Sequence, residues 1–299
     1  MKTFVIAALA FTAVFIVEGQ SGSSETAQLA PEFYRVRELG ATKAYSNPNP
    51  LRVVTWNIDH GTDLDKIVAG ITAHPCELCL LQEVDWNTAR SAEKDIAAEL
   101  AQRLGMNGAY AIEFEELSQE RGHPAYIGQA TLTRLPVLKS RILRFERQSG
   151  FWKPHSWIPS SVPLMQRRVG DRIALITELK FGGHLLVVYN AHLESRSAGP
   201  IQEHQLDEML SDVQRYTVGT AILLGGDLNT KYLPSFFLHR LEAAGFHSAL
   251  GEHIERTHRI AMSLDWLFVK GPVEIENGIV RRDIKGSDHY PVYATLAAR

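Results

Sequence analysis

Six apolar segments of the chain each end in polar residues that can bind a cation or a phosphate, and this pattern constrains the fold most. The segments are short and rich in strand-favouring residues, so we expect six β-strands. A lone amide, acid or histidine at such an end would be a turn former, a solvated charge or a core residue. Because buried charged groups need partners, six such ends together predict one shared site. The ends are Thr55-Trp56-Asn57, Leu81-Gln82-Glu83, Tyr189-Asn190-Ala191-His192, Gly226-Asp227-Leu228-Asn229, Leu264-Asp265-Trp266 and Ser287-Asp288-His289.

Helical spacing of apolar residues separates several of these strands. Asp63 is expected to cap a first helix, and Ser91 to cap a second that ends at Gly105. Further helices are predicted within 201–217 and over Phe236–Ala244, the latter ending at Gly245. Strands and helices in this mixed order predict two mixed β-sheets packed face to face, with helices on the outer faces.

The chain divides into three parts. Residues 51–299 hold all the predicted strands and helices, including a hairpin around Phe181-Gly182-Gly183-His184, and are expected to form one α/β domain. Residues 20–50 are rich in turn-forming residues and are predicted to be a linker or an irregular lead-in.

The first residues have the features of a secretory signal. Lys2 provides a positive start, an uncharged apolar run extends over 4–17, and small residues precede a plausible cut before Gln20. The apolar run is too short to span a bilayer comfortably. We therefore expect a signal peptide at 1–19 and a secreted or periplasmic protein.

The formal net charge of −3 provides no global basic field, although Arg167-Arg168 and Arg281-Arg282 could serve a phosphate. The two cysteines, Cys76 and Cys79, could form a local disulfide in an exported protein. A zinc site is excluded because no second pair of ligands with suitable spacing accompanies them. Within its apolar strand, Cys79 is expected to be a small core residue.

An aromatic insert over 151–159, with the sequence Phe-Trp-Lys-Pro-His-Ser-Trp-Ile-Pro, is expected to be a loop because of its prolines. Its aromatic side chains could pack beneath the loop as a small satellite core. Alternatively, they could form a substrate wall or, over 151–158, a transient foothold on a membrane.

Several of the strand ends, together with their neighbours, resemble the endonuclease/exonuclease/phosphatase superfamily. That superfamily includes deoxyribonuclease I, exonuclease III-like repair enzymes, bacterial sphingomyelinases and inositol polyphosphate phosphatases. The resemblance implies a four-layered α/β-sandwich and Mg²⁺-dependent cleavage of a phosphoester. The matching strings are Trp56-Asn57, Leu81-Gln82-Glu83-Val84, Asn190-Ala191-His192-Leu193, Gly225-Gly226-Asp227-Leu228-Asn229 and Ser287-Asp288-His289-Tyr290-Pro291-Val292.

Three residues resemble the metal-binding side of that family's site. Glu83 matches the principal metal ligand, with Asn57 beside it and Asp288 nearby. A hard cation prefers such oxygen ligands, so Mg²⁺ is expected, with Mn²⁺ as a possible substitute.

Five residues resemble the side of the site that handles the proton and the phosphate. His289 matches the general base, oriented by Asp265, and His192 matches the histidine that contacts the scissile phosphate. Asp227 and Asn229 match the pair that positions the nucleophile and the phosphate. His289→Ala is therefore expected to abolish turnover while leaving the fold intact.

Asn190 and Arg172 are expected to bind the substrate. For Arg172, an ion pair with the adjacent Asp171 is an equal alternative. Gln129 lies where relatives often carry Asn, Glu or Tyr, and its role stays open.

The sequence thus predicts a secreted, metal-dependent phosphodiesterase, with no obligate protein partner evident. Nuclease and sphingomyelinase-like activities compete, so the expected substrate is a nucleic acid or a phospholipid head group. The alternatives are a phosphomonoesterase acting on inositol phosphates or nucleotides, and a non-catalytic binding module on the same fold.

Overall fold

The structure of the chain is a computed structural model, and it describes residues 29–40, 48–153, 166–232 and 234–299. The expected signal peptide, 1–19, lies outside these ranges, as do Trp157 and Ile158 of the aromatic insert. Within them, no helix is both long and apolar enough to cross a bilayer.

The first of two sheets contains both the N-terminal and the C-terminal strands of the described chain. Its strand order is β1-β4-β5-β3-β2-β14-β13, with β7 paired to β4. Strands β2 and β3 run parallel, and all other neighbours run antiparallel. The strands are β1 (Val36–Leu39), β2 (Leu51–His60), β3 (Leu78–Trp86), β4 (Asn107–Glu115), β5 (Tyr126–Thr133), β7 (Val169–Gly170), β13 (Val273–Val280) and β14 (Val292–Ala298).

The second sheet is formed by the middle of the chain, in the order β11-β12-β10-β9-β8-β6. Its only parallel neighbours among the described strands are β9 and β10. The expected hairpin joins β8 to β9. The strands are β6 (Val137–Arg144), β8 (Ile173–Phe181), β9 (His184–His192), β10 (Ala221–Asp227), β11 (His247–Ser248) and β12 (Asp265–Lys270).

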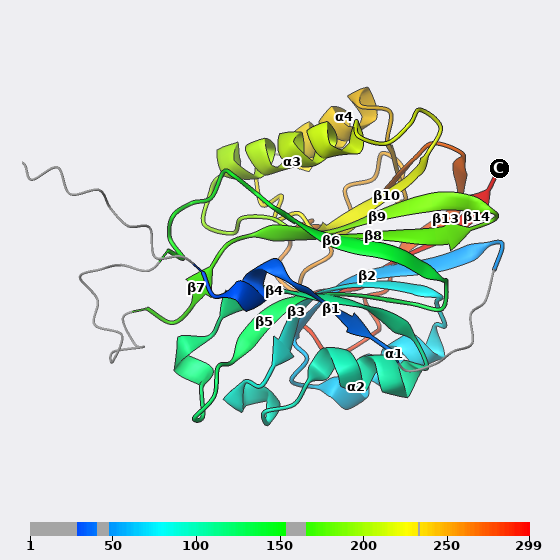
Figure 1. Cartoon of the computed structure of the whole chain (residues 1–299). Helices are drawn as coiled ribbons and strands as arrows, with labels where there is room; N and C mark the ends of the chain where they lie inside the picture. Colours follow the sequence, from blue (N-terminus) through cyan, green and yellow to red (C-terminus); the bar gives the residue numbers. More distant parts are fainter. Residues whose placement is uncertain (1–28, 41–47, 154–165, 233) are drawn as a thin grey trace, which may run out of the picture.

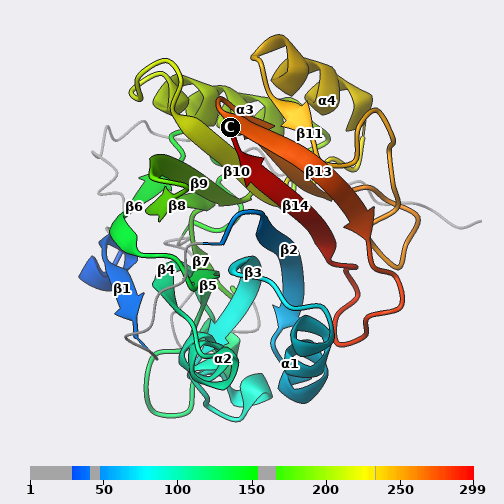
Figure 2. The ribbon, with the colours of Figure 1, turned by 90° about the vertical axis from the view of Figure 1, so that its right-hand side faces the viewer.

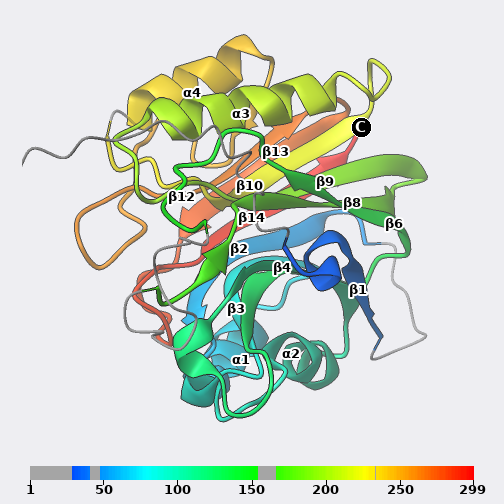
Figure 3. The ribbon, with the colours of Figure 1, turned by 60° about the vertical axis from the view of Figure 1, so that its left-hand side comes forward.

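Helices cover the outer face of each sheet (Figures 1 and 3). α1 (Leu64–Ala73) and α2 (Ile96–Leu104) pack their apolar faces on the first sheet. α3 (Pro200–Val213) and α4 (Pro234–Ala243) pack on the second. The expected four-layered α/β-sandwich is confirmed.

The two sheets are held together by a layer of aliphatic side chains between them. In β10, Leu223 faces this layer, whereas Ile222 and Leu224 face the helices on the opposite side. Successive side chains of a strand point to opposite faces, so a strand buried on both faces must be apolar throughout. This burial explains why Ala221–Leu224 reads as a continuous apolar run.

Part of the predicted lead-in belongs to the folded domain. A single 3₁₀ turn (Pro31–Tyr34) places Phe33 in the core with no exposed surface, and β1 then pairs with β4 at the edge of the first sheet (Figure 2). Phe33 packs edge-to-face against Tyr126, with ring centroids 6.2 Å apart. The interpretation of all of 20–50 as linker or irregular lead-in is therefore wrong for residues 31–39.

Truncating Phe33 measures how strongly this segment is bound. Phe33→Ala should lower the free energy of unfolding by about 3–5 kcal/mol, because it leaves a cavity in a packed core. The neighbouring Tyr34 is exposed, so Tyr34→Ala should change stability by less than about 0.5 kcal/mol. Urea unfolding of both variants checks this, and an equal, small effect would show that the segment is only loosely attached.

The two N-terminal helix caps differ from the prediction. Asp95, not Ser91, caps α2, and its carboxylate accepts from the amide of Ala98 at 3.0 Å. Ser91 instead ends a 3₁₀ turn, because Ala92 and Glu93 adopt left-handed φ angles that interrupt any continuous helix. Asp63 precedes α1 as expected, but its side chain pairs with Lys66 and makes no capping bond.

Cys76 and Cys79 are both buried, and their thiols are free. Their sulfur atoms lie 3.2 Å apart, so the local disulfide that the sequence left open is not formed. Cys79 is a core residue, as expected.

Candidate active site

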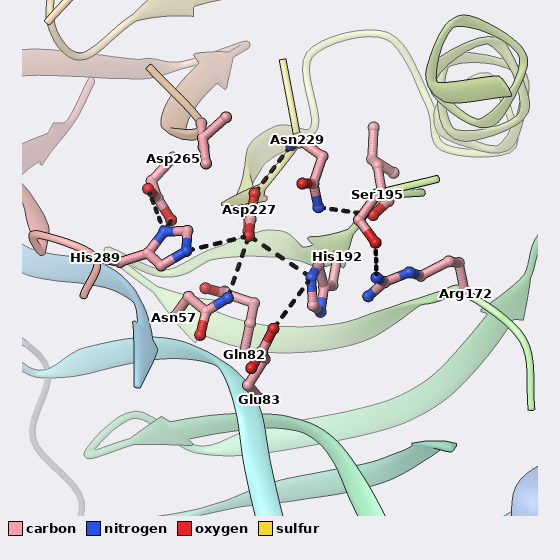
Figure 4. A network of polar contacts seen from close by, with 12 residues as sticks. Asn57, Gln82, Glu83, Arg172, His192, Ser195, Asp227, Asn229, Asp265 and His289 are labelled. Atoms are coloured by element: carbon pink, nitrogen blue, oxygen red, sulfur yellow. Dashed lines mark hydrogen bonds and ion pairs between the residues drawn. The ribbon is translucent and has the colours of Figure 1, made fainter. Parts of the chain in front are cut away.

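The polar strand ends converge at one end of the sandwich (Figure 4). β2 and β3 of the first sheet deliver Asn57 and Glu83, and β9 and β10 of the second deliver His192 and Asp227. Within each of these pairs the strands are parallel, so their carboxyl ends lie at the same edge. The predicted convergence is confirmed for these residues.

His289 and Asp265 form a buried pair. The Nδ1 atom of His289 lies 2.9 Å from one carboxylate oxygen of Asp265 and 3.1 Å from the other. The indole Nε1 of Trp56 donates to the carbonyl of His289 at 3.1 Å, which fixes its backbone. With Nδ1 donating to Asp265, the Nε2 atom of His289 is left facing the pocket.

The charges around His289 stabilise its protonated form. Burial alone would lower its pKa, but the charge and hydrogen bond of Asp265, with the charges of Asp227 and Asp288, raise the pKa to about 10. These charges therefore favour the imidazolium form of the ring.

Asp227 stands at the centre of the site. Its Oδ2 atom accepts from Nδ2 of Asn57 at 3.2 Å and lies 3.6 Å and 3.8 Å from the Nε2 atoms of His192 and His289. The preceding residue must be glycine for β10 to approach β9 this closely, because a Cβ on Gly226 would lie 1.8 Å from the carbonyl oxygen of Ala191 on β9. Asp227 thus connects both histidines to the amide from the opposite sheet.

Asn229 holds Asp227 in place. Asn229 has a left-handed φ of 49°, and its backbone amide donates to Oδ1 of Asp227 at 2.9 Å. Its side-chain amide donates to the carbonyl of Leu193 at 2.9 Å. Asparagine adopts this left-handed conformation more readily than most other non-glycine residues, which suits it to this position.

Glu83 also has a left-handed backbone, with φ of 52°, where the pairing of β3 with β5 shifts register. Burial opposes its charged form, but His60, His192 and Arg168 hold the pKa of Glu83 well below its usual value. Glu83 is therefore a carboxylate over the whole physiological range of pH.

Acidic groups beside Glu83 suit a hard cation. Asp59, His60 and Glu83 offer ligand atoms that all lie within 4.8 Å of one another. Burial, and the charges of Asp288 and Glu83, raise the pKa of Asp59. Crowded carboxylates of this kind are stabilised by a bound cation, and their oxygen atoms match the ligands that Mg²⁺ prefers.

Asp288 has a partner that the sequence did not indicate. The Nε2 atom of His258 lies 3.2 Å from Oδ2 of Asp288. The Nδ1 atom of His258 accepts from the backbone amide of Ile260 at 3.0 Å. Because Nδ1 accepts, the proton of the neutral ring is on Nε2 and points at Asp288. His258 also packs edge-to-face on His289, with ring centroids 4.6 Å apart.

The profile of the Endonuclease/Exonuclease/phosphatase family matches residues 54–289, a range that includes all of these side chains. The chain belongs to the endonuclease/exonuclease/phosphatase family. A sequence search of curated proteins finds no match.

Solved structures share the family fold at low sequence identity. A Beutenbergia cavernae endonuclease/exonuclease/phosphatase is 18% identical, covers 84% of this chain and 72% of its own, and has a TM-score of 0.62. The human Nocturnin catalytic domain with bound sulfate is 17% identical over 89% of this chain and 98% of its own, with a TM-score of 0.62. TDP2 from C. elegans is 20% identical over 83% and 75%, with a TM-score of 0.53.

Behind His192, this family member has a buried ion pair that the sequence did not predict. Glu113 of β4 accepts from Nη1 of Arg172 at 2.7 Å and lies 3.1 Å from Nδ1 of His192. Arg172 lines the pocket, and its second nitrogen donates to Oγ of Ser195 at 2.9 Å. The alternative pairing of Arg172 with Asp171 is wrong, because Asp171 pairs with Arg144.

Glu113→Ala should lower the free energy of unfolding by about 3–5 kcal/mol, because it leaves the buried guanidinium of Arg172 without this carboxylate. Glu38 is exposed on β1, and Glu38→Ala should change stability by less than about 0.5 kcal/mol. Denaturant unfolding of the two variants checks this. Equal stability would mean that water or another carboxylate replaces Glu113.

Asn190 and Gln129 are not part of the pocket surface. Asn190 has no exposed surface, accepts from Nε2 of Gln82 at 2.7 Å, and donates to carbonyls of β3 and β5 in the opposite sheet. Gln129 donates to the carbonyl of Ile173 and accepts from the backbone amide of Leu175, both on β8. Both amides therefore connect the sheets, and the expected substrate contact of Asn190 is not supported by its position.

Proposed function

We propose that the protein is a Mg²⁺-dependent phosphodiesterase, with Mn²⁺ as a possible substitute, in which His289 activates water for in-line attack on a phosphodiester. One observation carries this proposal: His289, which is held by Asp265, and Glu83, which lies beside Asp59, line the same pocket of about 630 Å³. An acid–base group beside a cation site is the arrangement that metal-assisted hydrolysis requires.

Glu83, Asn57 and Asp288 would hold the metal, with Asp59 beside them. A divalent cation bound there neutralises charge that develops on the phosphate oxygens. A cation held beside Asp288 would offset the charge of that carboxylate and would favour the neutral imidazole of His289, the form that accepts a proton.

The residues of the chain account for the movement of the proton. His289 takes a proton from water at Nε2 while Asp265 stabilises the imidazolium that forms. The water oxygen bonds to phosphorus, and the bond from phosphorus to the departing oxygen breaks. That oxygen leaves as an alcohol after it takes a proton from solvent, while His289 returns to solvent the proton that it accepted. Asp227 lies within 3.8 Å of Nε2 of His289 and can orient the attacking water.

His192 and Arg172 would contact the phosphate. His192 lines the pocket, and its Nδ1 is engaged by Glu113, so its Nε2 is directed at the site. A donor aimed at a phosphoryl oxygen gains strength as negative charge develops on that oxygen. Asn57 and Asn229 hold Asp227 beside His192, because each donates a hydrogen bond to one of its carboxylate oxygens.

We further propose that the enzyme is secreted or periplasmic, on the strength of the signal-like features of 1–19. This location favours extracellular phosphodiesters over the cell's own genome. Transport of a fusion that carries 1–50 ahead of a reporter, compared with the same fusion lacking 1–19, tests the proposal. Equal retention of both fusions inside the cell would contradict it.

A substrate panel tests the activity. The purified protein is incubated in Mg²⁺ or in EDTA with plasmid DNA, RNA, sphingomyelin, inositol phosphates and bis(p-nitrophenyl) phosphate. Hydrolysis that EDTA abolishes, and that His289→Asn lacks, supports the phosphodiesterase. Absence of hydrolysis in every arm would favour a binding module, and cleavage confined to phosphate monoesters would favour a phosphomonoesterase.

A further inference from the structure

The pocket extends beyond the catalytic residues to a wall that carries several cations. Arg167, Arg196 and Lys231 line it, together with the aromatic side chains of Phe151 and Trp152. Arg196 follows β9 four residues after His192, and Lys231 follows β10 two residues after Asn229. Both cations therefore adjoin the residues that face the scissile phosphate.

Lys231 is held close to the catalytic residues. Its Nζ atom donates to the carbonyl of Ser195 at 3.0 Å, and the hydroxyl of Ser195 accepts from Arg172. Burial lowers the pKa of Lys231, and the charges of Arg172 and Arg196 lower it further, against the opposing effect of Asp227. Lys231 therefore lies close to both Arg172 and Arg196.

Arg196 is placed by aromatic stacking. Its guanidinium carbon lies 4.6 Å from the ring centroid of Phe151 and 5.4 Å from that of Trp152. Arg168 also faces the Trp152 ring, at 5.3 Å. Stacking orders the guanidinium without neutralising its charge, so its N–H groups remain available for an anion.

The acidic partners of the pocket arginines are unevenly distributed. Arg168 pairs with Glu116 at 2.7 Å, and Arg172 pairs with Glu113. Across the ranges that the structure describes, by contrast, no ion pair joins Arg167, Arg196 or Lys231 to a carboxylate. These three cations line a pocket whose other side is built to accept one phosphate.

We propose that Arg196 and Lys231 form a subsite for a second phosphate group, so that preferred substrates carry another phosphate beside the scissile phosphodiester. This inference rests on the proposed phosphodiesterase function and adds the substrate class to it. The second phosphate can belong to a nucleotide or to an inositol ring, and matched probes separate these two sources.

The same wall disfavours a choline head group. A quaternary ammonium is recognised by uncovered aromatic faces, and here Arg196 and Arg168 already occupy positions over Phe151 and Trp152. A further positive charge would be repelled by these guanidinium groups. Sphingomyelin should therefore be a poor substrate.

Paired probes test the subsite. Thymidine 5′-(p-nitrophenyl phosphate) is compared with its 3′-phosphorylated form, and glycerophosphoinositol with its ring 4-phosphate. In at least one pair, kcat/KM should be about tenfold or more higher for the phosphorylated member, as expected for a charge-assisted hydrogen bond. Arg196→Gln and Lys231→Gln should each reduce that ratio about tenfold, whereas Arg196→Lys should retain more of it.

Lys180→Gln is the matched control, because Lys180 is exposed at the far end of β8. In this variant the ratio of kcat/KM between the two members of each pair should not change. Ratios near one in both pairs, or sphingomyelin turnover faster than that of both phosphorylated probes, would overturn the subsite and leave the phosphodiesterase standing. No metal-dependent turnover of any probe would overturn both. Thermal unfolding of each variant confirms that a changed ratio does not reflect a damaged fold.

Discussion

His289→Asn is expected to lower kcat by about a hundredfold to ten-thousandfold, the range that general acid–base catalysis contributes. The substitution removes the Nε2 atom that faces Asp227 and the pocket. An asparagine amide can still donate to Asp265 in place of Nδ1. Steady-state hydrolysis of bis(p-nitrophenyl) phosphate in saturating Mg²⁺ measures the effect.

The choice of asparagine follows from the burial of Asp265. This carboxylate has no exposed surface and pairs with His289, so His289→Ala would leave it buried without its partner. From the sequence, His289→Ala was expected to keep its fold. Because alanine leaves Asp265 without a partner, His289→Asn is the better test of catalysis. A thermal unfolding midpoint near that of the wild type, combined with wild-type kcat, would remove His289 from the mechanism.

Glu83→Gln should weaken Mg²⁺ binding by about a hundredfold or more, because even the loss of a group that only supports a metal ligand costs tenfold to a hundredfold. The substitution keeps the shape of the side chain and removes one negative charge beside Asp59. Mg²⁺ should raise the unfolding temperature of the wild type, since a ligand that binds only the folded state stabilises it. This rise should be absent in Glu83→Gln.

The thermal shift is independent of turnover, so it separates metal binding from catalysis. Glu93→Gln is the matched control, because Glu93 is an exposed glutamate and its substitution makes the same chemical change. An equal Mg²⁺-induced shift in Glu83→Gln and in the control would place the cation elsewhere.

The sequence predicted the fold and most of the site because the relevant signals are local. A polar residue directly after an apolar strand, as at Asn57, Glu83 or Asp227, marks the end of that strand. Parallel neighbours then bring such ends together without any further information. Glu83 and Asn229, both of which have left-handed backbones, are among the residues identified in this way.

The residues that were missed depend on contacts between distant parts of the chain. Glu113 lies within an apolar strand and reads as a charge on an exposed face, yet it is fully buried against Arg172, 59 residues away in sequence. His258 contacts Asp288 from a loop with no regular pattern. β1 was missed for the same reason, because its four residues pair with residues of β4 that lie 69 to 75 positions later.

The bond between Asn57 and Asp227 joins a residue of the first sheet to one of the second. The proposed catalytic arrangement therefore requires the two sheets to keep their relative position, since small displacements of catalytic groups lower the rate strongly. The paired amides of Gln82 and Asn190, placed between the sheets, are suited to resist sliding, which an aliphatic layer alone would tolerate. The proposed activity thus depends on the alignment of the two sheets, and it should be lost if they slide while each sheet is still folded.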